Sequence, residues 1–237
     1  MTTTTPAPGS SPAPTTSSKR PLVIGPPEGP EPPYPLRMEG KVIKGFGRGS
    51  KELGIPTANL PVPTHTPSWI TDIPSGVYFG WASLLLPPSH PDYIPHSPTN
   101  SPSSPSEAFK IHPMVMSIGY NPFYKNTLRS AEVHILHPFS SDFYGCEMRL
   151  LIAGFIRQEK DYAGLDALIE DINTDCEVAR QSLGRGKWMP RRGLYKDQGE
   201  AGEMDCEWLL RPLSPTPEGK EGEGVENGDG GEKKGEA

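Results

Sequence analysis

A glycine-rich, basic turn in the first quarter of the chain is the first stretch whose residue types could do chemistry. Gly45, Gly47 and Gly49 alternate ahead of Lys51. Glycines that adopt positive φ can turn successive backbone N–H groups toward one anion, and a lysine adds a point charge that a polyphosphate can use. A surface hairpin uses the same residue types, so this stretch alone leaves a phosphate site and a hairpin as alternatives.

A hydroxyl and an amide follow this turn closely. Thr57 and Asn59 lie two positions apart after Pro56, which in extended backbone places both side chains on one face. Two neutral oxygen ligands suit a magnesium ion that is bound to phosphate oxygens and keeps most of its water. The alternative is a proline-initiated turn with capping side chains. Because the glycine-rich turn is so near, we favour a magnesium-nucleotide site.

Glu132 is the acidic residue of a mostly apolar segment. A carboxylate in such a segment faces either solvent or a polar site. In a polar site it could accept the proton of a hydroxyl nucleophile while a phosphoryl group is transferred to that nucleophile. His134 and His137 lie three positions apart, so on a strand they point to opposite faces, which favours structural or ligand-contacting roles over a zinc pair.

A charged segment with a tyrosine, residues 157–162, lies between the last predicted strand and the predicted helix. Such a loop could clamp a planar ligand. The alternative is a solvated connection, and composition alone does not separate the two.

The elements that must position these residues are mainly strands. Alternating apolar residues predict strands, and the connections between them carry no helical pattern. Strands that follow one another in this way form an antiparallel sheet, and five or six of them tend to close into a barrel. The predicted strands lie around Val42 and Phe46 and at residues 76–86, 110–119, 131–137 and 148–156.

One helix is predicted, from Leu165 to Leu183, because its apolar residues recur at helical spacing. Asp161 is a candidate N-cap, and Gly184 is a candidate for C′, the residue after the C-cap. We expect the apolar stripe to pack over one opening or wall of the barrel, with Cys176 as a core residue on that stripe.

Composition divides the chain into one domain and two tails. Residues 1–35 and 212–237 hold too few apolar side chains to offset their chain entropy, so both are predicted to be disordered. The domain spans residues 36–211, with a Pro- and Ser-rich insertion at 87–108 in which His90 is expected to be solvated.

Charge and cysteine content exclude several classes of protein. The net charge is −6, and no block of lysines and arginines suggests a nucleic-acid partner. No apolar run is long enough for a membrane span. Three widely spaced cysteines indicate a reducing compartment, so we expect the protein in the cytoplasm. We also expect a monomer. The acid-free, Thr- and Ser-rich start leaves mitochondrial targeting as an alternative.

Several separate motifs resemble those of the riboflavin kinase (flavokinase) family, in its eukaryotic, fungal form. They occur in the family's order, and the resemblance covers nearly all of residues 40–183. The motifs are GFGRGSK at 45–51, LGIPTAN at 53–59, GVYFGWA at 76–82, SIGYNPFYKN at 117–126, EVHI at 132–135 and DFYG at 142–145.

This resemblance implies a six-stranded antiparallel Greek-key β-barrel with a C-terminal α-helix packed on it. It also implies transfer of the ATP γ-phosphoryl group to the ribityl 5′-hydroxyl of riboflavin, which gives FMN and ADP. The metal would be Mg²⁺, with Zn²⁺ as an alternative. The short segment ahead of the domain has no room for the adenylyltransferase domain of bifunctional bacterial enzymes, so we expect a monofunctional kinase.

The resemblance also implies roles for individual residues. Glu132 would be catalytic, and Thr57 and Asn59 would hold the metal within the nucleotide site. One tension is that Ile135 and His137 alternate to the face opposite Glu132, which would require contact through backbone groups, or a twist or bulge in the strand. The remaining implied contacts are Gly45, Lys51, Ile135, His137 and Tyr144 to the nucleotide, and Arg157, Lys160 and Tyr162 to the flavin.

The alternative function is a non-catalytic flavin- or nucleotide-binding barrel that serves as a sensor or scaffold.

Overall fold

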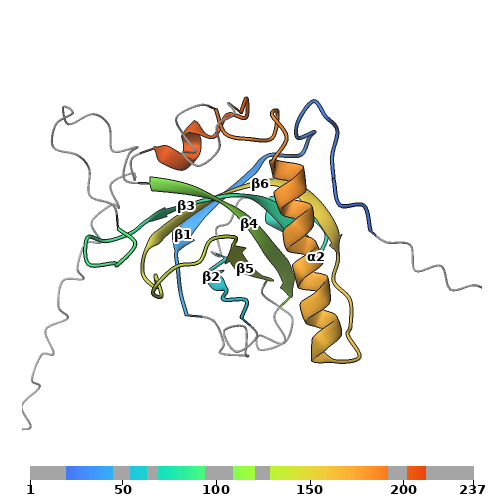
Figure 1. Ribbon diagram of the computed structural model, residues 1–237, viewed down its shortest axis with the longest axis horizontal. Coiled ribbons are helices and arrows are strands. Elements are labelled where there is room, and N and C mark those ends of the chain that lie inside the picture. The colour runs from blue at the N-terminus through green and yellow to red at the C-terminus, as the bar shows by residue number, and fades with distance from the viewer. Residues whose placement is uncertain are drawn as a thin grey trace, which may run out of the picture.

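A curled antiparallel sheet carries the fold in the computed structural model, which describes residues 20–44, 54–62, 69–93, 109–120, 129–191 and 202–211 (Figure 1). Six strands of the described chain lie in the spatial order β1-β6-β3-β4-β5-β2. They are β1 (Leu36–Lys41), β2 (Ala58–Leu60), β3 (Gly76–Leu85), β4 (Phe109–Tyr120), β5 (Arg129–Ile135) and β6 (Glu147–Gln158).

The connections between these strands form a Greek key. β3, β4 and β5 are consecutive neighbours, and β6 returns to pair with the free side of β3. The two outer strands meet where the backbone N–H of Ile43, just beyond β1, donates to the carbonyl oxygen of Asn59 in β2 at 2.9 Å. The sheet therefore curls into a barrel, and the predicted fold is confirmed.

Each face of the sheet carries an apolar core. Along β3, Tyr78 and Leu84 join the core inside the barrel, whereas Phe79 and Trp81 join a second core on the outer face. This alternation follows from the two-residue period of a strand. The second core lies beneath helix α2 (Leu165–Leu183) and the segments that flank it.

Helix α2 lies against the outer face of the sheet, where it contacts β3 and β4 (Figure 1). Cys176 is 5% exposed and belongs to the outer core, as expected. Gly184 was expected at C′ but is the C-cap itself, with φ of −70°, because the helix runs to Leu183. The predicted N-cap was wrong: Gly164 is the N-cap, in extended backbone, because the chain still has to cross from β6 to the outer face at Asp161.

Several short elements have no counterpart in the predictions. β1 lies ahead of the strand that was expected around Val42 and Phe46, and β2 has only three residues. The short helix α1 (Trp69–Asp72) and the 3-10 turn η3 (Glu207–Leu210) were not predicted either. β2, α1 and η3 have only three or four residues, too few to show a hydrophobic period.

Residues 20–35 differ from the disordered tail that the sequence suggested. They run beside α2 toward its C-terminal end before entering β1 (Figure 1). The backbone N–H of Ile24 donates to Ser182 Oγ at 2.9 Å, and Arg185 Nη1 donates to the carbonyl oxygen of Gly25 at 2.9 Å. Composition could not reveal this packing, because residues 20–35 contribute backbone groups to these two contacts.

The chain after α2 docks on the outer face of β3. Trp188 is 1% exposed, and its carbonyl oxygen accepts a hydrogen bond from Trp81 Nε1 at 2.9 Å. Ser83 Oγ donates to the carbonyl oxygen of Leu209 at 2.8 Å. These contacts cover the part of the sheet that α2 leaves open.

The first residues of the predicted insertion at 87–108 pack on the loop after β5. His90, which was expected to be solvated, is only 7% exposed, and its Nε2 lies 3.3 Å from the carbonyl oxygen of Ser141. Asp92 accepts hydrogen bonds from the backbone N–H and the hydroxyl of Ser140 at 2.7 and 2.8 Å. Burial here comes from a distant loop, which the local sequence does not show.

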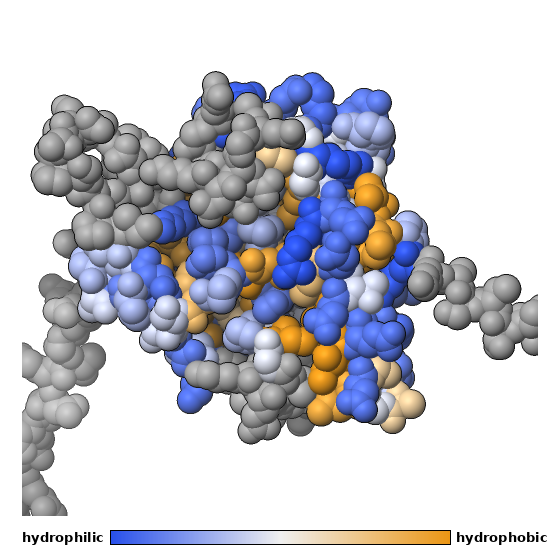
Figure 2. Space-filling model, in the orientation of Figure 1, coloured by the Kyte–Doolittle hydropathy of each residue, from blue (hydrophilic) through white to orange (hydrophobic). Residues whose placement is uncertain are grey.

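The surface that carries α2 mixes hydrophilic and apolar side chains, and the apolar ones lie in separate patches (Figure 2). The large apolar side chains exposed in the described ranges are Leu22, Val23, Ile43, Tyr120, Tyr144 and Leu165. None of the helices in the described part of the chain is long and apolar enough to cross a bilayer.

Candidate active site

Glu132 and Thr57 meet where β5 pairs with β2. In this pairing Asn59 lies opposite Glu132, and Ala58 lies opposite Val133. Val133 belongs to the core inside the barrel, so the strand period turns Glu132 outward. There the Thr57 hydroxyl donates to Glu132 Oε1 at 2.5 Å. Two predicted metal ligands and the predicted catalytic carboxylate therefore come together.

His134 holds the turn that leads to Thr57. Its Nδ1–H donates to the carbonyl oxygen of Pro56 at 2.8 Å. Burial lowers the pKa of His134, the hydrogen bond to Pro56 opposes this effect, and the charge of Arg180 adds to it. The ring is therefore neutral near pH 7 and serves as a hydrogen-bond donor.

A cavity of about 620 Å³ opens on the side to which Glu132 points. We call it the outer cavity, because it lies between the outer face of the sheet, α2 and residues 157–162. Glu132, Thr57 and the three predicted flavin contacts all line it. Leu168 and Ile172 of α2 contribute apolar wall. One space thus brings together residues that are far apart in the sequence.

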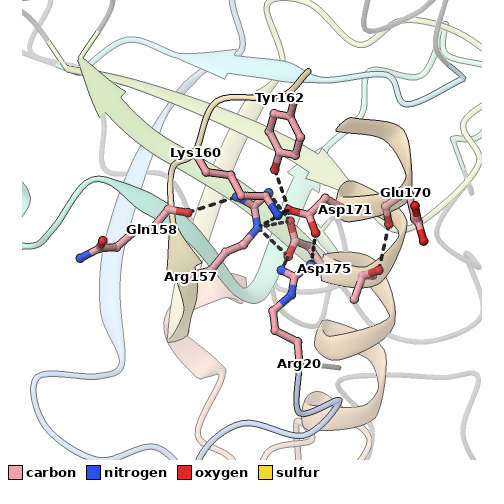
Figure 3. A network of polar contacts seen from close by, with 9 residues as sticks. Arg20, Arg157, Gln158, Lys160, Tyr162, Glu170, Asp171 and Asp175 are labelled. Carbon is pink, nitrogen blue, oxygen red and sulfur yellow. Dashed lines mark hydrogen bonds and ion pairs between the residues drawn. The ribbon is translucent and has the colours of Figure 1, made fainter. Parts of the chain in front are cut away.

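The three predicted flavin contacts are held by two aspartates of α2 (Figure 3). Arg157 makes a bidentate pair with Asp175, with Nη2 2.8 Å from Oδ2 and Nε 3.1 Å from Oδ1. Lys160 Nζ and Tyr162 Oη each lie 2.7 Å from Oδ2 of Asp171. Asp175 is 2% exposed, so this pairing orders the rim of the outer cavity.

The network keeps Asp171 ionised and Tyr162 neutral. Burial opposes ionisation of Asp171, but hydrogen bonds from Lys160 and Tyr162 and the charge of Arg157 outweigh it, so the pKa of Asp171 is lowered. Burial, together with the hydrogen bond to Asp171, raises the pKa of Tyr162 to about 12. Tyr162 therefore remains a neutral donor at physiological pH.

A second cavity, of about 380 Å³, lies on the other side of Thr57. We call it the mouth cavity, because core residues of the barrel and the loop after β5 line it. Three predicted nucleotide contacts, Ile135, His137 and Tyr144, are among its lining residues. Thr57 lines both cavities. The two spaces therefore share the residue that binds Glu132.

The separation of the two cavities resolves the tension in the strand pattern. Ile135 and His137 face away from Glu132 because they line a different space. The register of β4 and β5 runs unshifted from Met114 opposite Ile135 to Tyr120 opposite Arg129. The strand therefore needs no bulge here.

An aromatic cluster at the mouth cavity was not predicted. The ring of Phe139 lies edge-on to His137 and Phe143, with centroids 4.8 Å away in each case. His137 also packs on His112 at 4.5 Å. In the sequence, the only signal for this cluster is Phe139, an aromatic residue shortly after β5.

The remaining predicted site residues concern the metal and the phosphates. Thr57 and Asn59 offer oxygen donors beside Glu132, and Asn59 is only 8% exposed, so this donor set fits a magnesium ion. Gly45 and Lys51 lie outside the described residues.

A sequence profile of the riboflavin kinase (flavokinase) family matches residues 32–183, from just ahead of β1 to the end of α2. The chain belongs to the riboflavin kinase family. The matched region contains every described residue that lines the outer cavity or the mouth cavity.

Curated relatives agree with this family. A riboflavin kinase of Pyricularia oryzae is 60% identical over 200 residues, which cover 83% of this chain and 96% of the relative. One of Chaetomium globosum is 57% identical over 221 residues, which cover 81% and 94%. The crystal structure of riboflavin kinase from Trypanosoma brucei aligns with a TM-score of 0.47 and 25% identity over 64% of this chain and 82% of that one.

Proposed function

We propose that this member of the riboflavin kinase family transfers the γ-phosphoryl group of ATP to the ribityl 5′-hydroxyl of riboflavin, giving FMN and ADP. Riboflavin occupies the outer cavity, and the nucleotide occupies the mouth cavity. The observation that carries this assignment is the hydrogen bond between Thr57 and Glu132, because Thr57 lines both cavities. A donor in one cavity and an acceptor in the other would meet at this pair.

The size and chemistry of the outer cavity support a flavin. Small-molecule sites span roughly 300 to 1,000 Å³, and this cavity has about 620 Å³. Its apolar wall can cover an aromatic ring system, while Arg157, Lys160 and Tyr162 offer polar contacts at its rim. For the mouth cavity, we propose contacts from Ile135, His137 and Tyr144, with Gly45 and Lys51 binding phosphate.

Glu132 acts as the general base in this scheme. Its carboxylate takes the proton as the 5′-O–H bond breaks and the oxygen bonds to the γ-phosphorus. The bond between that phosphorus and the oxygen of ADP then breaks. Thr57 orients the carboxylate through Oε1. Direct transfer needs no phosphorylated enzyme, so Glu132 is assigned as a base and not as a nucleophile.

Magnesium is the metal that we propose, held by Thr57 and Asn59 together with nucleotide phosphates. Bound there, it would neutralise charge on the phosphates. Oxygen donors favour Mg²⁺, and within the described ranges no three His, Cys, Asp or Glu side chains converge as in a zinc site. Metal-stripped protein should therefore regain activity with Mg²⁺ more fully than with Zn²⁺.

Incubation of the purified chain with ATP, Mg²⁺ and riboflavin tests the proposed reaction. We expect FMN and ADP in equal amounts, measured by chromatography. Binding of riboflavin without formation of FMN would contradict the proposal and favour the sensor or scaffold. That alternative is the less favoured one, because binding alone does not require the carboxylate of Glu132.

We also propose that the chain forms one domain and is a monomer in the cytoplasm. Cys146, Cys176 and Cys206 are all free and buried, which fits a reducing compartment. Size-exclusion chromatography with light scattering checks the oligomeric state, and a fluorescent fusion in a fungal cell checks the compartment.

A further inference from the structure

The N-terminal segment reaches the rim of the outer cavity through Arg20. We propose that Arg20 is a positioning residue for the riboflavin site, which acts through Asp171 and Asp175 on the cavity residues that these carboxylates hold. The inference rests on the proposed use of the outer cavity for riboflavin. Arg20 does not line that cavity, so its effect on the ligand must pass through the two aspartates.

Arg20 and the cavity residues bind different oxygens of Asp171, and Arg20 shares Oδ1 of Asp175 with Arg157 (Figure 3). Its guanidinium spans one turn of α2, with Nη1 2.5 Å from Oδ1 of Asp175 and Nη2 bonded to Oδ1 of Asp171. On Asp171 the other oxygen, Oδ2, accepts from Lys160 and Tyr162. By holding Oδ1 of both carboxylates, Arg20 fixes their rotation and therefore the direction of the oxygens that hold the rim.

The charge balance gives Arg20 a second effect. Arg20, Arg157 and Lys160 are three cations that share two carboxylates. Without Arg20, each carboxylate would be matched by one cavity cation, and both cations would be held more tightly. With Arg20 present, Arg157 and Lys160 keep donor capacity for a ligand in the cavity.

The segment around Arg20 is anchored, so the guanidinium is not a loosely held surface group. Arg185 donates to the carbonyl oxygens of Ile24 and Gly25 at 2.5 and 2.9 Å. Trp188 Nε1 donates to the carbonyl oxygen of Pro26 at 2.9 Å. Gly25 has φ of +81°, and a Cβ there would lie 2.4 Å from the Trp188 ring. Only glycine fits this close approach.

Steady-state kinetics of the full chain with Arg20→Gln test the proposal. We expect KM for riboflavin to rise about fivefold, the low end of coupling between sites, with kcat and KM for ATP little changed. The Kd for riboflavin, measured by quenching of flavin fluorescence, should rise by the same factor. Arg20→Lys keeps the charge but loses the planar fork of donors, so its KM for riboflavin should lie between those of the unmodified chain and Arg20→Gln.

Two controls separate this role from a general loss of structure. Arg191→Gln removes an arginine whose Nη1 lies 3.9 Å from Glu207 in an exposed ion pair, and it should leave all the constants unchanged. In an Asp171→Asn background, Arg20→Gln should raise KM for riboflavin less than it does in the unmodified chain, because part of its route is already lost.

An unchanged KM for riboflavin in Arg20→Gln, in a chain that still makes FMN, would overturn the inference and leave the proposed function standing. Equal losses in kcat and in both KM values would also overturn it, since they would indicate structural damage. Failure of the unmodified chain to bind riboflavin would refute the proposed function, and with it this inference.

Discussion

The hydroxyl of Thr57 donates a hydrogen bond to the carboxylate of Glu132 at 2.5 Å, although 75 positions separate the two residues in the sequence. The contact arises because β2 pairs antiparallel with β5. It joins a candidate metal ligand to the candidate base, so a mutation at Thr57 should affect both metal binding and catalysis by Glu132.

Thr57→Val removes this hydroxyl at nearly constant volume. A hydrogen bond to a charged group contributes about 1.5 to 3 kcal/mol, so we expect kcat/KM to fall roughly 10- to 100-fold. The Mg²⁺ concentration for half-maximal rate should rise as well. The matched control is Thr71→Val, whose hydroxyl donates to Asp72 at 3.1 Å on the surface. Equal rates for the two variants would contradict the role of Thr57.

Asp175→Asn should weaken the fold as well as the site. Asp175 is 2% exposed and pairs with both Arg157 and Arg20. Removing one member of a buried pair costs about 3 kcal/mol, which urea unfolding measures. Glu177→Gln, at a surface hydrogen bond to Gln181, is the control and should change little. Matching midpoints for the two variants would show that the buried pair is not stabilising.

The parts of the fold that follow from local pattern could be predicted from the sequence. β3 to β6 and α2 are long enough to show a period, and Glu132 stands out because it interrupts an apolar strand. The short β2 has no such pattern. Its pairing with β5, and with it the contact between Thr57 and Glu132, depends on closure of the whole sheet.

Contacts between segments that are far apart in the sequence could not be predicted from local patterns. His90 is buried by the loop after β5, and Arg20 is held by carboxylates that lie more than 150 positions away. The partition of the site into two cavities was missed for the same reason. The strand pattern placed Ile135 and His137 on the face opposite Glu132, but it did not show that the two faces line different cavities.

His112 gives a pH dependence of stability. Burial, with the nearby charges of His137 and Lys110, lowers the pKa of His112 from 6.5 to about 4. The unfolded chain therefore binds more protons between these values, and stability falls as the pH drops from 6.5 toward 4. Over this range, the free energy of unfolding of His112→Gln should fall by up to about 3 kcal/mol less than that of the unmodified chain. Parallel urea-unfolding profiles against pH would contradict this.

The most direct test of the central claim is the turnover of Glu132→Gln, measured as FMN formed in a single turnover. Removing a general base should lower the rate about 10²- to 10⁴-fold, while the Kd values for riboflavin and ADP stay close to those of the unmodified chain. Glu159→Gln, in the other glutamate that lines the outer cavity, should keep most of the activity. An unchanged rate of FMN formation in Glu132→Gln would contradict the assignment of Glu132 as the base.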